Sequence, residues 1–326
     1  MASPEPDAVL GSFGADPAAA TIVAIGGRGP WLLAWERLRR DPVAVGCFVV
    51  ILLVVAAALG APLVAHLLGH GPNTQFRDTG LSAEGIPVGP SKKFLFGTDD
   101  LGRDVFLRVL YGARISLLAG VSASGIAVFI GVFVGLAAGY IGGIVDTVLS
   151  RFMDVVLSLP YLVFAIALVS LVGPSLVISI VVIAMFSWAS VGRVVRGQAL
   201  SAREKEFVES AQALGAGNLR IMVVDVLPNV LGPAIVYATM LIPLSIVFEA
   251  TLSFLGVGVL PPTATWGNML AESIPYYRVA WWFVAFPGLA LLVTTLAFNL
   301  LGDAVRDALD PRGPLARTRK RRWFRG

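Results

Sequence analysis

The sequence has a single cysteine and few charged residues. Cys47 stands alone among 326 residues, so neither a disulfide nor a paired-thiol redox site can form within the chain. Charged residues make up only 14% of the chain, against 56% hydrophobic residues. The mean hydropathy of +0.81 lies far outside the range of soluble globular domains. This composition indicates a membrane protein that crosses the bilayer several times.

Signatures of catalysis and of nucleotide binding are also missing. The chain contains no Gly-x-x-x-x-Gly-Lys-Ser/Thr phosphate loop, and no Ser-His-Asp, His-Glu-x-x-His or Cys-x-x-Cys arrangement. We therefore predict a non-catalytic chain that holds no cofactor. Its two histidines, His66 and His70, are spaced to share a helix face, but no third ligand accompanies them and Gly-Pro follows. We predict no metal site and assign these side chains to the membrane interface.

Six apolar stretches each approach the ~20 residues that cross about 30 Å of hydrocarbon. They cover residues 43–59, 115–140, 155–171, 176–194, 231–255 and 282–301. The sequence therefore predicts an all-α membrane protein with six transmembrane helices. In the second stretch, Gly131, Gly135 and Gly139 recur at every fourth position, a spacing that lets another helix backbone approach closely.

The positive charges indicate how the chain is oriented. An even number of spans puts both termini on one side, and 18 of the 25 lysines and arginines fall on that side. Because basic residues are enriched in cytoplasmic segments, we predict that both termini are cytoplasmic. The net charge of +4 then follows from topology, and we predict no binding of nucleic acid.

A polar island separates the fourth and fifth apolar stretches. Its charged residues from Arg203 to Glu206 would each cost ~3 kcal/mol at the middle of a bilayer, so this segment lies in water. Apolar residues at helical spacing predict an amphipathic helix with one apolar face, formed by Leu200, Phe207, Ala211 and Leu214. That helix should end near Gly215, and a second short helix should cover residues 219–226 and be closed by Pro228.

Glu249 is a carboxylate inside the fifth apolar stretch, with Ser245 and Ser253 one turn away on either side. Charged residues inside membrane spans are expensive unless they face protein or water. One interpretation places Glu249 on a translocation path, where it meets a substrate amine or cation. The other makes it a partnered carboxylate that holds helices together.

The first long loop precedes the second stretch and should have a structure of its own. Thr98 or Asp99 is expected to cap an interfacial helix that runs through Val105 and ends at Gly112. This segment could equally contact an external partner. A Gly- and Pro-rich turn after the fifth stretch, leading to Trp266, could dip back toward a pore.

Several motifs resemble those of a known family. Glu209, Ala211, Gly215 and Leu227-Pro228-Asn229 are similar to the EAA loop of ABC-importer permeases. Further segments resemble the second (C-type) permease of dipeptide, oligopeptide and nickel importers, namely residues 96–105, 111–117, 252–256, 266–270 and 299–303. The resemblance runs from about Trp35 to Arg312. Ser210 stands where alanine is common in the family, and Asp225 where histidine is common.

The resemblance implies the fold of a type I ABC importer permease (MetI-like) in a bacterial plasma membrane. It also implies that the loop docks on an ATPase subunit, through Glu209, Ala211, Gly215, Ala216, Leu227, Pro228 and Asn229. The implied partners are a homologous B-type permease, two ABC ATPase subunits that hold ATP and Mg, and an extracytoplasmic binding protein. The residues implied for contact with that external protein are Asp99, Asp100, Arg103, Asp104 and Trp266.

On this basis the chain is expected to divide into six segments. These are a disordered cytoplasmic tail (1–30), an amphipathic interfacial segment (31–42), the first transmembrane helix (43–60), an extracytoplasmic loop (61–114), a permease core (115–303) with the coupling loop 196–230, and a basic cytoplasmic tail (304–326). Membrane lipid is expected to surround the transmembrane part of the chain.

The implied activity is ATP-driven import of dipeptides or oligopeptides, with nickel or another small solute as the alternative within the family. A rival from another class is an ion-driven secondary carrier that acts alone. Such carriers commonly contain internal repeats with broken helices, and no convincing repeat is visible here. A membrane scaffold is the third interpretation, but it leaves Glu249 without a purpose.

Overall fold

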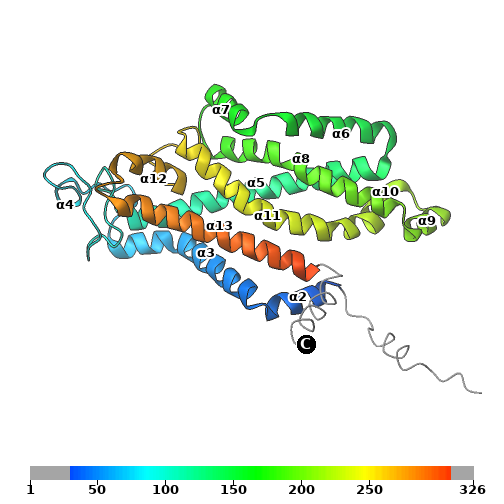
Figure 1. Ribbon diagram of the computed structural model, residues 1–326, viewed down its shortest axis with the longest axis horizontal. Coiled ribbons are helices and arrows are strands. Elements are labelled where there is room, and N and C mark those ends of the chain that lie inside the picture. Colours follow the sequence, from blue (N-terminus) through cyan, green and yellow to red (C-terminus); the bar gives the residue numbers. More distant parts are fainter. Residues whose placement is uncertain (1–29, 310–326) are drawn as a thin grey trace, which may run out of the picture.

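The computed structural model describes residues 30–309, and it is built of helices (Figure 1). Among these residues, β pairing is limited to two isolated bridges, Leu81 with Pro87 and Thr98 with Asp104. The predicted all-α class is confirmed. The tail predicted at residues 1–30, apart from Pro30, lies outside the described residues, as does the basic tail beyond residue 309.

The chain enters through two helices, α2 (Pro30–Arg40) and α3 (Pro42–Leu68). Asp41 separates them and caps α3, since its carboxylate accepts a hydrogen bond from the Val43 amide at 2.9 Å. The predicted first span ended at residue 60, but α3 continues to Leu68 and stops at Gly69, whose φ is +73°. Pro62 lies inside α3 and removes one backbone hydrogen bond, because proline has no N–H group. The helix continues through it, with apolar residues on both sides. The outer loop therefore begins later than predicted.

Helix α5 (Val105–Ile141) is a single helix of 37 residues. Two predictions about its beginning were wrong: Asp104 caps it rather than Thr98 or Asp99, and Gly112 does not end it. A Cβ at Gly112 would lie 3.2 Å from Cδ1 of Trp266. This glycine therefore lets Trp266 pack closely against α5 and does not end the helix. No separate interfacial helix precedes the second span; the loop before it contains only the short α4 (Arg77–Gly80).

The glycines of α5 pack against α8 (Leu176–Arg203), as their spacing predicted. A Cβ at Gly131 would lie 2.7 Å from the carbonyl oxygen of Trp188, and one at Gly139 would lie 2.6 Å from that of Arg196. Gly135 faces the Gly192 carbonyl even more closely. Only glycine allows two backbones to approach this far, so α5 and α8 form the tightest pair in the bundle.

The predicted third span is not one straight helix. Helix α6 (Gly143–Ser158) and helix α7 (Tyr161–Val172) meet at an angle of 86°. Pro160 accounts for the break, because proline disfavours a helical residue before it and cannot donate to the preceding turn. The described residues thus contain five helices long and apolar enough to cross a membrane, or six if the bent pair forms one span.

The second half of the chain follows α8 with α9 (Glu206–Ala213), α10 (Asn218–Arg220), a π-helical segment η1 (Ile221–Val226) and α11 (Leu227–Phe254). A fold-back segment contains α12 (Trp266–Ser273) and the 3-10 turn η2 (Ile274–Tyr276). The last element is α13 (Trp281–Leu309), which extends beyond the predicted span at both ends.

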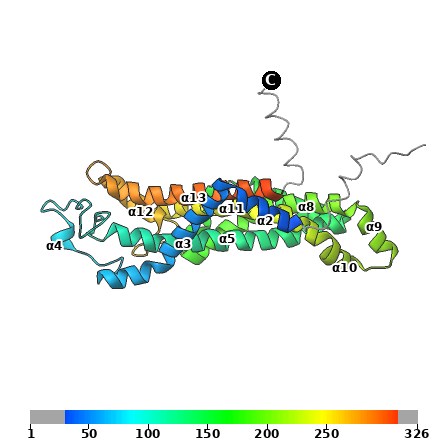
Figure 2. The same cartoon turned by 90° about the horizontal axis from the view of Figure 1, so that it is seen from below.

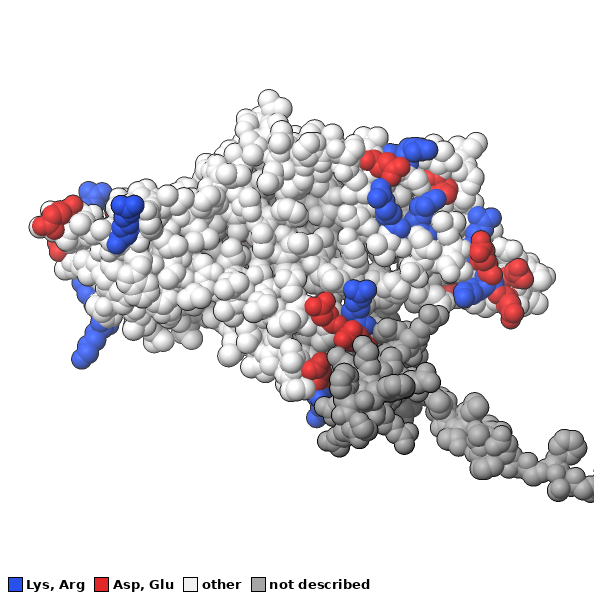
Figure 3. All heavy atoms as spheres, in the orientation of Figure 1, with Lys and Arg blue, Asp and Glu red and all other residues white. Residues whose placement is uncertain are grey.

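The long helices run side by side, with α4 and α12 at one end of the molecule and α9 at the opposite end (Figures 1 and 2). On the face shown in Figure 3, charged side chains gather at the end that holds α4, over the part of the bundle that leads from α6 and α8 to α9, and beside α2 and the end of α13. The broad surface between the first group and the other two is uncharged. This distribution is that of a bundle set in a bilayer, since charge is excluded from the hydrocarbon layer.

Candidate functional site

The polar island forms a helix, a turn and a second helix, as predicted. At the end of α9, Gly215 has a φ of +79° and its amide donates to the Gln212 carbonyl at 2.9 Å. The next amide, of Ala216, donates to the Ala211 carbonyl at 3.0 Å. These two bonds make a Schellman motif, which requires a left-handed residue at the Gly215 position.

The inner side of this island joins the core of the bundle. Val208 of α9, Ile221 and Val226 of η1 are fully buried and belong to the same cluster as Trp188 and Val195 of α8. Apolar packing therefore joins α9 and η1 directly to the membrane helices.

The predicted coupling residues differ in exposure: three pack against the core and four are exposed. Ala211, Ala216 and Leu227 are partly buried against the core, and Glu209, Gly215, Pro228 and Asn229 are exposed. Leu214 was expected on the inner apolar face, but it follows the last turn of α9 and is 88% exposed. Leu219, in α10 after the turn, is 71% exposed, so the segment from the end of α9 to α10 carries two exposed leucines, the apolar tip.

The prediction that Pro228 closes the second helix was wrong. Residues 218–254 form one continuous 37-residue helix in which Pro228 occupies the first turn of α11. The π-helical segment η1 lies directly before it, and wider turns of this kind accommodate a missing backbone donor. Asp225, the departure from the family pattern, is partly buried in η1, and its carbonyl accepts from the Asn229 amide group at 2.7 Å.

Glu249 is fully buried where α11 meets α5. One of its carboxylate oxygens accepts a hydrogen bond from Ser116 of α5 at 2.8 Å, and the other accepts from Ser253 at 2.7 Å. The Ser245 hydroxyl, also fully buried, lies 3.0 Å from that of Ser124 on α5. Glu249 and Ser245 thus link α11 to α5, and Ser253 supports Glu249 from the same helix, which favours the partnered-carboxylate interpretation.

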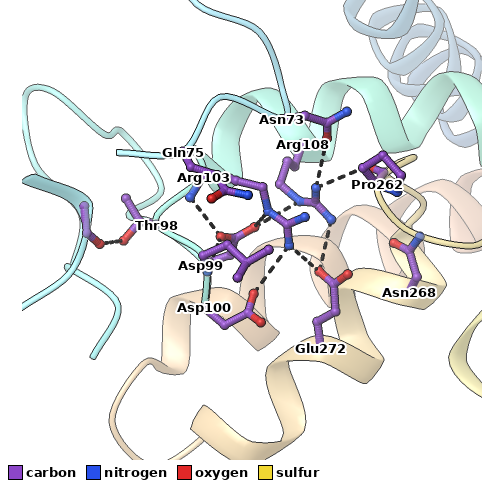
Figure 4. A network of polar contacts seen from close by, with 12 residues as sticks. Asn73, Gln75, Thr98, Asp99, Asp100, Arg103, Arg108, Pro262, Asn268 and Glu272 are labelled. Atoms are coloured by element: carbon purple, nitrogen blue, oxygen red, sulfur yellow. Dashed lines mark hydrogen bonds and ion pairs between the residues drawn. The ribbon is translucent and has the colours of Figure 1, made fainter. Parts of the chain in front are cut away.

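A network of ionic contacts (Figure 4) lies beside α12, at the end of the molecule opposite the polar island (Figure 1). Arg103 and Arg108 are 3% and 0% exposed. Both guanidinium groups pair with Glu272 of α12 at 3.0 Å. Both also pair with Asp99, at 2.5 Å from Arg103 and at 3.2 Å from Arg108. The network thereby ties the outer loop, the start of α5 and the fold-back segment together.

Burial raises the pKa of the Glu272 carboxyl above its ordinary value, although Arg108 and Arg103 act in the opposite direction. Burial likewise raises the pKa of Asp100, and its neighbour Asp99 adds to the shift by repulsion. The pKa of Asp104 is raised by burial too, while a hydrogen bond to His70 at 3.1 Å partly offsets the effect.

Three carboxylates of this network lie close together. Oxygens of Asp99, Asp100 and Glu272 lie within 4.8 Å of one another, a spacing that suits a cation. Arg103 and Arg108 supply positive charge to this cluster directly. The two histidines do not share a helix face, because α3 ends at Leu68 and His70 instead binds Asp104.

The residues implied for contact with an external protein are mostly buried. Asp99, Arg103, Asp104 and Trp266 are at most 3% exposed, and the Trp266 indole donates to the Val109 carbonyl at 3.1 Å. Their side chains hold the loop and α12 against α5, which corrects the expectation of a direct contact through these four groups. Asp100 is partly exposed.

Sequence reasoning missed Glu272 and Arg108 as partners. Arg108 was recognisable as a charge next to an apolar run, a position that demands a counter-ion. Nothing in the sequence linked it to Glu272, which lies 164 residues away. The fold-back predicted for the segment before Trp266 supplies this link: the Val259 amide donates to Ser253 at 3.1 Å, and Gly267 packs on Ala250.

Two family models match the chain. The model described as binding-protein-dependent transport system inner membrane component covers residues 131–313. The N-terminal TM domain of oligopeptide transport permease C covers residues 29–82. The first match begins inside α5 and continues through α13, so it contains the whole polar island.

Similar proteins include three permeases. The chain is 41% identical over 278 residues to the di/tripeptide transport system permease protein DppC of Pseudomonas aeruginosa, covering 85% of this chain and 91% of that protein. It is 39% identical over 286 residues to the oligopeptide transport system permease protein OppC of Escherichia coli K12, covering 88% and 92%. It is 40% identical over 285 residues to the glutathione transport system permease protein GsiD of Escherichia coli O6, covering 87% and 91%.

Proposed function

The chain belongs to the family of binding-protein-dependent transport system inner membrane components, and on that premise we propose that it is the permease subunit of an ATP-driven peptide importer. The observation that carries the proposal is the island between α8 and α11. It presents an exposed apolar tip at one end of the molecule, and its inner face is part of the bundle's core.

Short peptides are the proposed cargo. The names of the three relatives concern di- and tripeptides, oligopeptides and glutathione, which is itself a tripeptide. Their similarity to this chain is nearly uniform, at 39–41% identity over most of its length, so it supports the class of cargo rather than one member of it.

ATP hydrolysis would be supplied by two separate ATPase subunits, one of which receives α9 and the tip formed by Leu214 and Leu219. Closure of the ATPase pair would displace α9. Because α10, η1 and α11 form one continuous helix from residue 218 to residue 254, that displacement would be passed along a single helix, which contains Pro233 and Pro243, toward the Glu249 cluster.

The island then faces the cytoplasm, and both termini lie on the same side. The end that holds α4, α12 and the ionic network faces outward, where an extracytoplasmic binding protein delivers peptide. A homologous permease would complete the path in the plasma membrane. Helix α2, basic in its last turn, would lie at the inner surface near anionic lipid headgroups.

Copurification tests this proposal. Tagged chain should bring down the ATPase subunits when these and the homologous permease are coexpressed with it. Gly215→Val should abolish that association, because a β-branched residue at φ +79° disrupts the turn that ends α9. Gly217→Ala is the matched control, since no atom lies within 4 Å of the added Cβ. Full ATPase recovery with Gly215→Val would contradict the proposed role of α9.

A further inference from the structure

Arginine and aspartate side chains of α6 and α8 surround an open pocket of about 380 Å³. Two ion pairs join the helices across it. Arg196 of α8 donates to both carboxylate oxygens of Asp146 on α6. Arg193 of α8 donates to Asp154 on α6 at 2.6 Å. The pocket volume falls within the roughly 300–1,000 Å³ that small-molecule sites occupy, so the pocket can admit a ligand.

The charges that line this pocket do not balance. Arg151 of α6 adds a third guanidinium group to the two carboxylates and two arginines already named. It is 81% exposed, and its ion pair with Asp154, at 3.6 Å, is too long for a hydrogen bond. Among the described residues Arg151 has no other polar partner. One positive charge is therefore in excess, on a side chain whose donors are free to bind an anion.

The carboxylate oxygens of the pocket, in contrast, are all engaged. Both oxygens of Asp146 accept from Arg196. In Asp154, Oδ1 accepts from Arg193 and Oδ2 faces Arg151. A ligand that carries an ammonium group would find no unpaired carboxylate oxygen here. The pocket therefore suits a ligand with a net negative charge.

The pocket lies where the uncharged surface of the bundle ends. Along the sequence, the third apolar stretch begins just after Asp154, and the fourth ends at Val194, next to Arg193. Figure 3 shows the charged side chains over α6 and α8 beside the broad uncharged surface, on the side that leads to α9. In a bilayer this is the level of the lipid headgroups, because charge is excluded from the hydrocarbon layer.

An apolar stripe on α6, formed by Val148, Phe152 and Val155, leads from the pocket into the hydrocarbon layer. These side chains are 59%, 55% and 57% exposed, and their spacing puts them on one helix face. Arg151 lies on the same face, one turn from Val148 and from Val155. Beyond the stripe, α6 ends at the bend to α7, which packs against Ala123 in the middle of α5. The stripe thus starts beside Arg151 and runs toward the middle of the bilayer, as the chains of a phospholipid do.

We infer that the pocket between α6 and α8 binds the headgroup of an anionic phospholipid, with the phosphate at Arg151 and Arg193 and an acyl chain along the apolar stripe of α6. The two arginines share Asp154, so their remaining donors lie close together. Basic pockets between membrane helices bind anionic headgroups. A soluble phosphate would contact the arginines but leave the stripe uncovered, whereas a lipid adds apolar contact to the ionic one. This site goes beyond the proposed function and depends on neither the cargo nor the ATPase.

Native mass spectrometry of the full chain in detergent tests the site. Dioleoylphosphatidylglycerol is titrated into delipidated protein, and the dissociation constant of the first bound lipid is measured. Arg151→Gln should weaken this binding about tenfold, because a charge-assisted contact with phosphate is lost. Arg151→Lys keeps the charge and should weaken it by about threefold or less. Since Arg151 makes no hydrogen bond within the described residues, Arg151→Gln should leave the thermal midpoint of the lipid-free protein unchanged.

The matched control is Arg278→Gln, which makes the same change of net charge at an exposed residue at the other end of the bundle. It should leave the binding of the first lipid unchanged. Equal weakening by Arg151→Gln and Arg278→Gln would overturn the inference, because the lipid would then respond to net charge and not to this pocket.

Two further ligands separate the anionic lipid from its alternatives. Dioleoylphosphatidylethanolamine, whose headgroup carries an ammonium group, should bind about tenfold more weakly than the anionic lipid. Glycerol 3-phosphate at millimolar concentration should not displace the anionic lipid. Equal binding of the two lipids, or displacement by glycerol 3-phosphate, would overturn the inference. The proposed function is tested separately by copurification of the ATPase subunits, so its failure and that of the lipid site are distinguishable.

Discussion

Glu249 on α11 and Ser116 on α5 are joined by a 2.8 Å hydrogen bond in a region where both side chains are fully buried. Since Ser253 satisfies the second carboxylate oxygen at 2.7 Å, neither oxygen lacks a partner. Glu249, the charged residue in the fifth apolar stretch, therefore has a structural role: its hydrogen bond to Ser116 holds α11 against α5.

Replacement of Glu249 should distinguish its two possible roles. Glu249→Leu leaves the hydroxyls of Ser116 and Ser253 buried without their acceptors, at a cost of about 1–3 kcal/mol each. Glu249→Gln keeps the shape and one acceptor, so it should lower the thermal midpoint of the purified complex far less. Thr251→Val, on the same helix, is the control. If Gln and Leu lowered the midpoint equally, the hydrogen bonds would not be what stabilises this contact.

The contact between α5 and α8 yields a second prediction. Gly135→Ala forces a methyl group against the Gly192 carbonyl and should destabilise the bundle by about 1–3 kcal/mol. Gly125→Ala on the same helix should be neutral, because nothing lies within 4 Å of its added Cβ. Yield of folded protein and thermal midpoint in detergent provide the measurement. Equal midpoints for the two variants would show that the close approach is not needed.

The ionic network predicts a pH dependence. Because burial raises the pKa of Glu272, the folded state favours its protonated form relative to the unfolded state. Its contribution to stability is then fully present below the ordinary pKa and is lost as the pH rises through the raised one. Glu272→Gln should remove this component and flatten the pH profile of the thermal midpoint.

Asp78→Asn, at an exposed carboxylate in the same outer loop, is the control and should leave the profile unchanged. The profile is measured by thermal unfolding of the purified complex at a series of pH values from the ordinary pKa of glutamate upward. A Glu272→Gln profile that follows that of the unsubstituted chain would contradict the assignment of this titration to Glu272.

The features that the sequence predicted correctly depend on local chemistry. Gly215 ends α9 because a left-handed backbone favours glycine, and this preference is visible in the sequence itself. The α5 glycines face α8 because their spacing marks one side of a helix. Glu249 drew attention for the same reason, since a lone charge in an apolar stretch is conspicuous.

The features that were missed depend on contacts between distant residues. Glu272 is one acidic residue among many until α12 folds back onto Arg108. Leu214 fitted the apolar periodicity of α9, but the helix ends just before it, so the side chain points outward at the tip. Gly112 looked like a helix end, and only its contact with Trp266 shows why a glycine is needed there.

The most direct measurement is peptide uptake into proteoliposomes that contain the chain, the homologous permease and both ATPases, with binding protein supplied outside. The account predicts that uptake requires ATP inside, and that Leu214→Glu at the exposed tip abolishes both uptake and the stimulation of ATP hydrolysis by loaded binding protein. The homologous permease should still assemble with this variant. Peptide uptake by the purified chain alone, with no ATPase present, would contradict the account.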